Sequence, residues 1–176
     1  MTQQFAYIKP EPISSVEIID LLELNPNSYS RSEFVIIKSK DCFQPILNIK
    51  LDSNYSPTFK QAEILDNLVV IGYGNHFLIF YYINKEIRVK KNLDGYFSEF
   101  KIYKNNIFLA TDSQLICFNI EGKQEWLTDN LGIDGVQINK IDETHIEGSG
   151  EWNPPNGWRD FALETNTGKI IPVNKP

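Results

Sequence analysis

Histidine and cysteine are scarce in this sequence, with two residues of each among 176. Cys42 and Cys117 lie far apart, whereas a secreted disulfide scaffold normally carries more cysteines at closer spacing. Both have apolar neighbours, so we expect two reduced thiols in the core of a cytoplasmic protein. His76 and His145 have no second ligand at a spacing that suits zinc, and we therefore expect no metal site.

Long hydrophobic runs and an excess of positive charge are also missing. No apolar run approaches the roughly 20 residues needed to cross a bilayer, and the N-terminus has neither the charged start nor the apolar stretch of a secretory signal. The net charge of -6 argues against a general nucleic-acid binder, which should be basic. We expect a cytoplasmic protein that binds neither membranes nor nucleic acid.

Catalytic motifs are absent as well. Gly72–Gly74 lacks the third glycine and the following helix of a phosphate-binding loop, and Ser149 does not stand in a nucleophile-elbow pattern. The segment 129–134 lacks the alternating oxygen ligands of a calcium loop. Paired carboxylates such as Glu147 and Glu151 carry little information in so acidic a chain. We therefore expect no enzyme activity and no cofactor.

An internal period of 39 residues is present. The segment Leu68–Tyr73 recurs as Ile107–Asp112 and again as Ile146–Glu151, 39 residues later each time. Each copy is followed by a second apolar run, a polar turn and a third short run, and is preceded by another extended stretch. Short runs rich in Ile, Val, Phe and Tyr between Gly, Asn and Asp predict β-strands. Each copy therefore predicts four short strands in an antiparallel meander.

The repeat defines the expected domain organisation. We expect a mainly β protein with three to four blade-like units, at about residues 33–58, 59–96, 97–134 and 135–173. The first of these is a degenerate copy. Together they form a β-repeat domain over residues 33–176, preceded by an N-terminal segment over residues 1–32.

One helix is expected, within the N-terminal segment. Ser14 precedes an apolar run, Glu17 follows three residues later and Pro26 lies just beyond, which is the pattern of a capping box and a proline stop. We predict a short helix over residues 14–24. Its apolar stripe would cover an open sheet face of the repeat domain.

The segment Asn106–Trp126 reads as strand, turn, strand, Gly122-Lys123 and then a tryptophan. It resembles a blade of the quinoprotein-type β-propeller repeats. The resemblance implies stacked blade-like units, with Trp126 packed between neighbours. The flanking copies carry Val89 and Ile171 at the tryptophan position, and nothing in the chain matches the quinone ligands of that family.

The last copy of the repeat contains an insertion. The two earlier copies connect their second and third strands with about two residues, whereas the last copy uses the stretch 151–158, which contains Trp152 and Trp158 around Pro154-Pro155. Insertions within a repeat often form loops on a binding face, and rigid aromatic side chains suit binding hot spots. Alternatively, both tryptophans fold back and cover the exposed end of the last unit; the sequence leaves both readings open.

Charge is unevenly distributed. Residues 121–164 contain ten acidic and three basic residues, a local net charge of -7, whereas residues 85–104 have a local net charge of +3. Such an acidic segment is either an ordinary solvated surface or a face that attracts a basic partner and speeds its capture.

These features predict a non-catalytic module that binds another protein. The segments Leu131–Val136 and Asn153–Trp158 are similar to small bacterial orphan proteins of toxin-immunity neighbourhoods, which implies an immunity protein that neutralises a basic toxin such as a nuclease. In this interpretation four residues supply charge complementarity: Asp134, Glu147, Glu151 and Asp160. Trp152 and Trp158 supply contact area.

Two alternatives come from other classes. One is a small-ligand or glycan binder in which four residues of the loop stack on a sugar ring and hydrogen-bond it: Trp152, Asn153, Asn156 and Trp158. The other is a degenerate repeat scaffold or homo-oligomer subunit, in which the tryptophans serve self-association only.

Overall fold

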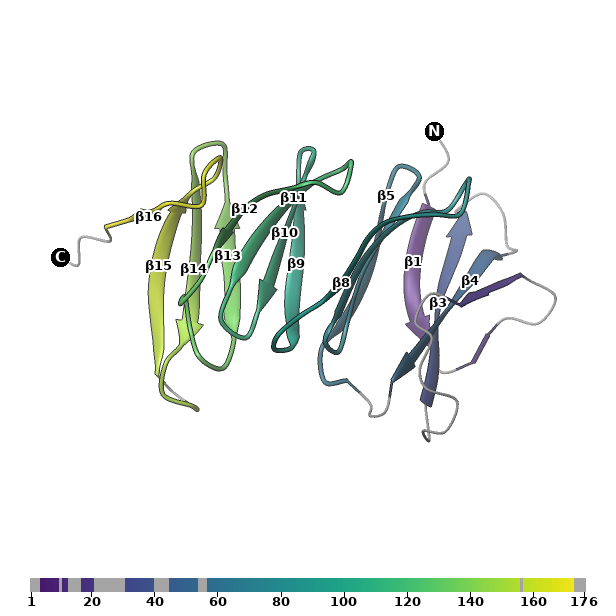
Figure 1. Cartoon of the computed structure of the whole chain (residues 1–176), viewed down its shortest axis with the longest axis horizontal. Coiled ribbons are helices and arrows are strands. Elements are labelled where there is room, and N and C mark those ends of the chain that lie inside the picture. Colours follow the sequence, from purple (N-terminus) through teal and green to yellow (C-terminus); the bar gives the residue numbers. More distant parts are fainter. Residues whose placement is uncertain are drawn as a thin grey trace. The chain divides into compact units, whose positions relative to one another are not determined.

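The computed structural model describes residues 4–9, 11–12, 17–20, 31–39, 45–53, 57–155 and 157–172. These residues form four four-stranded sheets, and the described part of the chain contains no helix (Figure 1). It follows that no described helix could span a membrane. The chain divides into two compact units, residues 1–91 and residues 92–176. The prediction of a mainly β fold built from four-stranded sheets is confirmed.

Sheet A belongs to the first unit and has the strand order β1-β3-β4-β2. Its strands are β1 (Gln4–Lys9), β2 (Ile18–Asp20), β3 (Arg31–Ser39) and β4 (Pro45–Ser53). β3 and β4 form an antiparallel hairpin, β1 pairs antiparallel with β3, and β2 pairs parallel with β4. Sheet A therefore takes both of its outer strands from the N-terminal segment.

The short helix predicted over residues 14–24 is not found. Its described centre, Ile18–Asp20, is the strand β2, and residues 14–16 and 21–24 lie outside the described residues. Ile18 and Ile19 pair with Asn48 and Ile49 of β4, and the side chain of Ile19 packs against the core of the first unit. The capping-box pattern is a local signal, and pairing with β4 together with the strand preference of β-branched residues outweighs it.

Sheet B completes the first unit as a meander, β5-β6-β7-β8. Its strands are β5 (Lys60–Leu65), β6 (Leu68–Tyr73), β7 (His76–Tyr81) and β8 (Glu86–Asn92). Alternate apolar side chains of sheets A and B form one core, which includes Val35, Ile37, Ile49, Val69, Ile71, Leu78 and Phe80. Each such fully buried side chain contributes about 1.5–3 kcal/mol relative to exposure.

The second unit contains two further meanders. Sheet C consists of β9 (Phe97–Tyr103), β10 (Asn106–Thr111), β11 (Leu115–Asn119) and β12 (Gln124–Thr128). Sheet D consists of β13 (Val136–Ile141), β14 (His145–Glu151), β15 (Trp158–Glu164) and β16 (Ile170–Ile171). The three copies of the sequence repeat thus correspond to sheets B, C and D, and the repeated segment forms the second strand of each: β6, β10 and β14.

The core of the second unit lies between sheets C and D. It is formed by buried side chains of both sheets, including Phe108, Leu115, Cys117, Trp126, Val136, Ile138, Ile146, Phe161 and Leu163. The rings of Phe108 and Trp126 are tilted to one another at a centroid distance of 5.9 Å. The indole N–H of Trp126 donates a hydrogen bond of 3.2 Å to the backbone carbonyl of Thr165, which is 39 residues further along the chain.

Cys117 is a free, buried cysteine in this core. Burial raises the pKa of its thiol to about 12, with a smaller contribution from the negative charge of Glu125. A thiol with so high a pKa is a poor nucleophile, because the thiolate is the reactive species. Cys42, the other expected core thiol, lies outside the described residues.

Candidate functional site

The candidate site is the outer surface of sheet D, the surface turned away from sheet C. Strand alternation sends Ile146 and Phe161 into the core and leaves Glu147 and Asp160 exposed on the other side. Gly148 lies opposite Phe161 in the register, and a Cβ at this glycine would stand 2.3 Å from the Phe161 ring. The glycine therefore allows the ring to pack directly on β14.

A hollow of about 410 Å³ opens on the outer side of these strands. It is lined by Asn139, Glu147, Gly148, Asp160, Phe161 and Ala162. Its volume is in the range of ligand pockets. Two of the residues expected to supply charge, Glu147 and Asp160, thus meet at one place. Their carboxylates can accept hydrogen bonds from a cationic or N–H-rich group, and Asn139 adds an amide that can donate or accept.

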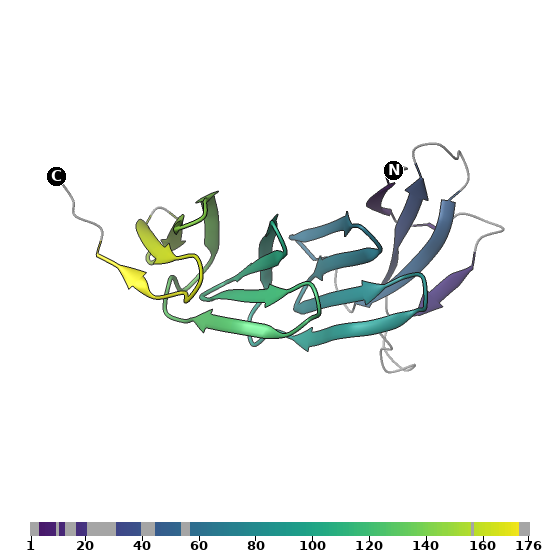
Figure 2. The ribbon, with the colours of Figure 1, turned by 90° about the horizontal axis from the view of Figure 1, so that it is seen from above.

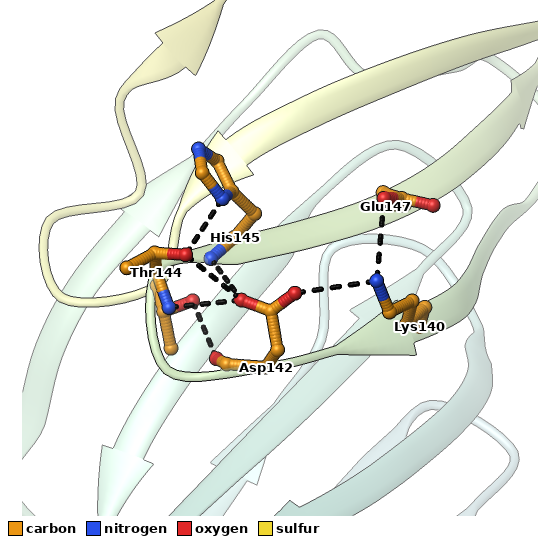
Figure 3. Close-up of polar contacts among 6 residues, drawn as sticks. Lys140, Asp142, Thr144, His145 and Glu147 are labelled. Carbon is orange, nitrogen blue, oxygen red and sulfur yellow. Dashed lines mark hydrogen bonds and ion pairs between the residues drawn. The ribbon is translucent and has the colours of Figure 1, made fainter.

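A polar turn joins β13 to β14, and Lys140 connects it to Glu147, one of the residues that line the hollow (Figure 3). Asp142 Oδ1 accepts hydrogen bonds from the backbone N–H groups of Thr144 and His145, each at 2.9 Å. Lys140 Nζ lies 3.3 Å from Asp142 Oδ2 and 3.8 Å from Glu147 Oε1. The pKa of Asp142 is held far below its usual range, chiefly by the backbone N–H of Thr144. Lys140 offsets part of the negative charge at this side of the hollow.

Glu151 forms the base of the inserted loop. Its side chain is 3% exposed, and its Oε1 accepts hydrogen bonds from the backbone N–H groups of Asn153 at 3.0 Å and Gly157 at 2.6 Å. The backbone N–H of Trp152 donates to the carbonyl of Gly157 at 3.1 Å. The Glu151 carboxylate therefore holds both ends of the loop together, and its charge is directed into the loop.

The two tryptophans of the loop differ in exposure. Trp158 is 43% exposed at the start of β15, on the same side of the strand as Asp160. Trp152 is partly buried, and the guanidinium of Arg159 lies 5.4 Å from the centre of its ring. Asn153 is exposed, and Asn156 lies outside the described residues. Trp158 is thus accessible to solvent, whereas the guanidinium of Arg159 lies over the ring of Trp152.

Asp134 joins the site through a residue that sequence reasoning missed. The Tyr96 hydroxyl donates a hydrogen bond of 3.3 Å to Asp134 Oδ1. Gly135 has a φ of +136°, and a Cβ there would be in ordinary contact with both neighbours, 3.4 Å from Tyr96 Oη and 3.6 Å from Trp158 Cη2. Tyr96, Asp134 and Trp158 therefore surround this glycine. Burial raises the pKa of Tyr96 to about 12, and the charge of Asp134 and their hydrogen bond add to the effect.

Sequence reasoning also missed Asn139 and Arg159. Arg159 follows Trp158 directly, so its proximity to an aromatic ring could have been suspected from the sequence. Asn139 occupies the irregular position where the β13–β14 register shifts between Ile138 and Lys140, and no sequence signal marks that bulge. Within residues 57–155 and the other described ranges, no group of three or more His, Cys, Asp or Glu side chains is placed to hold a metal ion.

Comparison with known proteins assigns neither a family nor a function to the chain. No model of a protein family matches the chain, and no curated protein matches its sequence.

Proposed function

We propose that this chain is a non-catalytic module that binds a basic protein through the outer surface of sheet D and the loop at residues 151–158. The observation that carries the proposal is the hollow in which Glu147 and Asp160 meet, beside the 43% exposed indole of Trp158. Trp158 lies two residues before Asp160 on the same face of β15. A basic side chain can therefore enter the acidic depression while apolar surface of the partner packs on the exposed indole.

The charge distribution supports the same interpretation. Glu147, Asp160 and Asp134 are all exposed, and residues 121–164 carry a local net charge of -7. Such a surface raises the rate at which a basic partner associates, because long-range attraction guides the encounter. Glu151 has a different role in the proposal, since its buried carboxylate positions the loop and does not reach the partner.

The partner class that fits best is a basic bacterial toxin, for example a nuclease, with this chain as its cytoplasmic immunity protein. A nuclease carries a positively charged surface for its substrate, and an acidic, catalytically inert protein can cover that surface. The similarity of Asn153–Trp158 to proteins of toxin-immunity neighbourhoods supports this choice.

A second candidate, a glycan binder, is favoured by one observation. Asn139 and Asp160 line one hollow, and the exposed Trp158 lies on the same strand face as Asp160. Sugar binding commonly combines an aromatic platform with such polar groups. The two candidates differ in salt dependence, because stacking on a neutral sugar responds little to ionic strength.

The test is titration calorimetry of the chain with the protein encoded by the reading frame that adjoins its gene. The Debye length falls from about 30 Å at 0.01 M salt to about 8 Å at 0.15 M. We expect binding to weaken on the order of tenfold between these conditions, mainly through the association rate. Glu147→Gln and Asp160→Asn should each weaken binding, while Glu121→Gln, which removes an exposed charge from the turn between β11 and β12, should do so much less. The proposal would be contradicted if the affinity were the same at both salt concentrations and unchanged in Glu147→Gln and Asp160→Asn.

A further inference from the structure

The indole of Trp158 reaches across the end of β14. Trp158 is the register partner of Glu151 in β14, and the backbone N–H of Glu151 donates to the carbonyl of Gly135, the residue before β13, at 2.9 Å. A Cβ at Gly135 would stand 3.6 Å from Trp158 Cη2, so the ring extends from β15 over β14 toward β13. β16, the yellow strand in Figure 2, lies on the other side of β15. The contact at Gly135 is therefore independent of the β16 side of the sheet.

Tyr96, which directly precedes β9 of sheet C, reaches the same glycine. A Cβ at Gly135 would stand 3.4 Å from Tyr96 Oη, and this hydroxyl donates to Asp134 Oδ1 at 3.3 Å. The backbone of the two loop residues is also tied down. The N–H of Asp134 donates to the carbonyl of Glu151 at 3.3 Å, and the N–H of Gly135 donates to the carbonyl of Asp112 at 2.7 Å. An exposed carboxylate is thus held in a fixed place beside an exposed indole.

Negative charge at this place is not neutralised by the second unit itself. A Cβ at Gly95 would overlap the carboxylate of Asp112, so this second carboxylate packs on the residue before Tyr96. Burial raises the pKa of Tyr96 most, and the charges of Asp134 and, to a smaller extent, Asp112 raise it further. Within residues 92–155 and 157–172, no lysine or arginine forms an ion pair with either carboxylate. A cation from outside the chain would complete this arrangement.

We propose that an arginine side chain of the basic partner binds here, with its guanidinium stacked on the indole of Trp158 and hydrogen-bonded to Asp134, which Tyr96 holds in position. This inference rests on the proposed function and adds a binding point that is separate from the hollow at Glu147. Tyr96 is a positioning residue in it, because its hydroxyl acts on the partner only through the carboxylate.

Arginine suits this place better than lysine. Its planar guanidinium stacks on aromatic rings and offers several N–H donors to one carboxylate, whereas an ammonium group is a compact, strongly hydrated charge. The same pair of groups already occurs within the loop, where the guanidinium of Arg159 lies 5.4 Å from the centre of the Trp152 ring. Trp158 offers a second indole with 43% of its surface exposed.

The test uses NMR on the full chain with two small probes, N-acetylarginine N-methylamide and its lysine counterpart. We expect the arginine probe to shift the amide signal of Gly135 and the indole N–H signal of Trp158 in a saturable way. The lysine probe should bind more weakly at the same signals. Trp158→Ala should weaken binding of the arginine probe by about twofold to fivefold, the contribution of a cation–π contact at an exposed site.

Three further variants separate the carboxylate, its positioning and general charge. Asp134→Asn removes the charge and should weaken both probes. Tyr96→Phe retains the ring and removes the hydroxyl, so it should reduce the preference for arginine over lysine, a readout that a merely structural role would not move. Asp129→Asn is the matched control, because it removes an exposed charge from the same connection between β12 and β13 and should change neither affinity.

The arginine site is overturned if the signals of Gly135 and Trp158 do not move, if lysine binds as well as arginine, or if Asp129→Asn acts like Asp134→Asn. Partner binding distinguishes this inference from the proposed function. If the partner binds in the salt-dependent manner and Glu147→Gln weakens it, but Asp134→Asn and Tyr96→Phe do not, the arginine site is overturned and the proposed function stands. If the arginine probe binds as expected but partner binding is insensitive to salt, Glu147→Gln and Asp160→Asn, the proposed function is contradicted and the arginine site stands.

Discussion

The indole N–H of Trp126 in β12 donates a hydrogen bond of 3.2 Å to the backbone carbonyl of Thr165, just beyond β15. Trp126 belongs to sheet C and Thr165 follows the third strand of sheet D, and both residues are buried. The contact therefore connects two successive copies of the repeat through one polar group and one large ring. Its strength can be measured by substitution.

Trp126→Phe retains most of the ring and removes the donor. The buried carbonyl of Thr165 then loses this hydrogen bond, so we expect a loss of about 1–3 kcal/mol in the free energy of unfolding. Trp126→Ala also removes the contact with Phe108, and the loss should reach about 3–5 kcal/mol. Urea denaturation of the purified chain measures both. Equal stability of Trp126→Phe and the original chain would show that the hydrogen bond contributes nothing.

Glu151→Ala should loosen the inserted loop. The Glu151 carboxylate accepts hydrogen bonds from the N–H groups of Asn153 and Gly157, and bonds to a charged acceptor are worth about 1.5–3 kcal/mol each. We expect reduced stability together with faster amide exchange at Gly157. Glu151→Gln retains an accepting oxygen, so its stability and its amide exchange at Gly157 should lie between those of Glu151→Ala and those of the original chain. Unchanged exchange in Glu151→Ala would exclude a positioning role for this carboxylate.

Asp142 should stabilise the protein in a pH-dependent way. In the folded state its pKa lies below the ordinary value of 3.8, chiefly because the backbone N–H of Thr144 donates to the carboxylate and then because that of His145 does. A lowered pKa means that the stabilisation is complete above 3.8 and is lost as the pH falls below it. Asp142→Ala should therefore lower Tm at neutral pH, and the difference from the original chain should shrink at acid pH. A difference in Tm that is independent of pH would contradict this assignment.

Tyr96 should ionise only at unusually high pH. Burial, followed by the charge of Asp134, raises its pKa from 10.0 to about 12. The protonated phenol therefore stabilises the fold fully below pH 10, and this contribution is lost as the pH rises toward about 12. NMR of chains labelled at the tyrosine ring can follow the titration, with Tyr96→Phe to assign the signal. In Asp134→Asn the pKa should fall but stay above 10.0, because burial remains.

The repeat could be predicted because each copy is recognisable from the apolar and polar residues that follow one another within it. Leu68, Ile107 and Ile146 stand 39 residues apart, and each lies in the second strand of its sheet. The local reading was wrong where a tertiary contact competed with it, at Ile18–Asp20. There the capping-box pattern predicts a helix, and pairing with β4 produces a strand.

The candidate site was predictable in part. The inserted loop and the acidic segment pointed to Glu147, Trp158 and Asp160, and two of these line one hollow. No sequence pattern pairs Tyr96 with Asp134, 38 residues away, or shows that Glu151 is buried while Glu147 is exposed. Both facts depend on how the loops before β13 and after β14 fold against the sheet.

The order of amino acids by itself determined the repeated strands of sheets B, C and D, because alternation of apolar and polar side chains acts between near neighbours in the chain. Only the tertiary structure decided which carboxylates reach solvent and which of them hold a loop. Those properties arise from hydrogen bonds and packing between segments far apart in the chain, whose register is set when the sheets pair and stack.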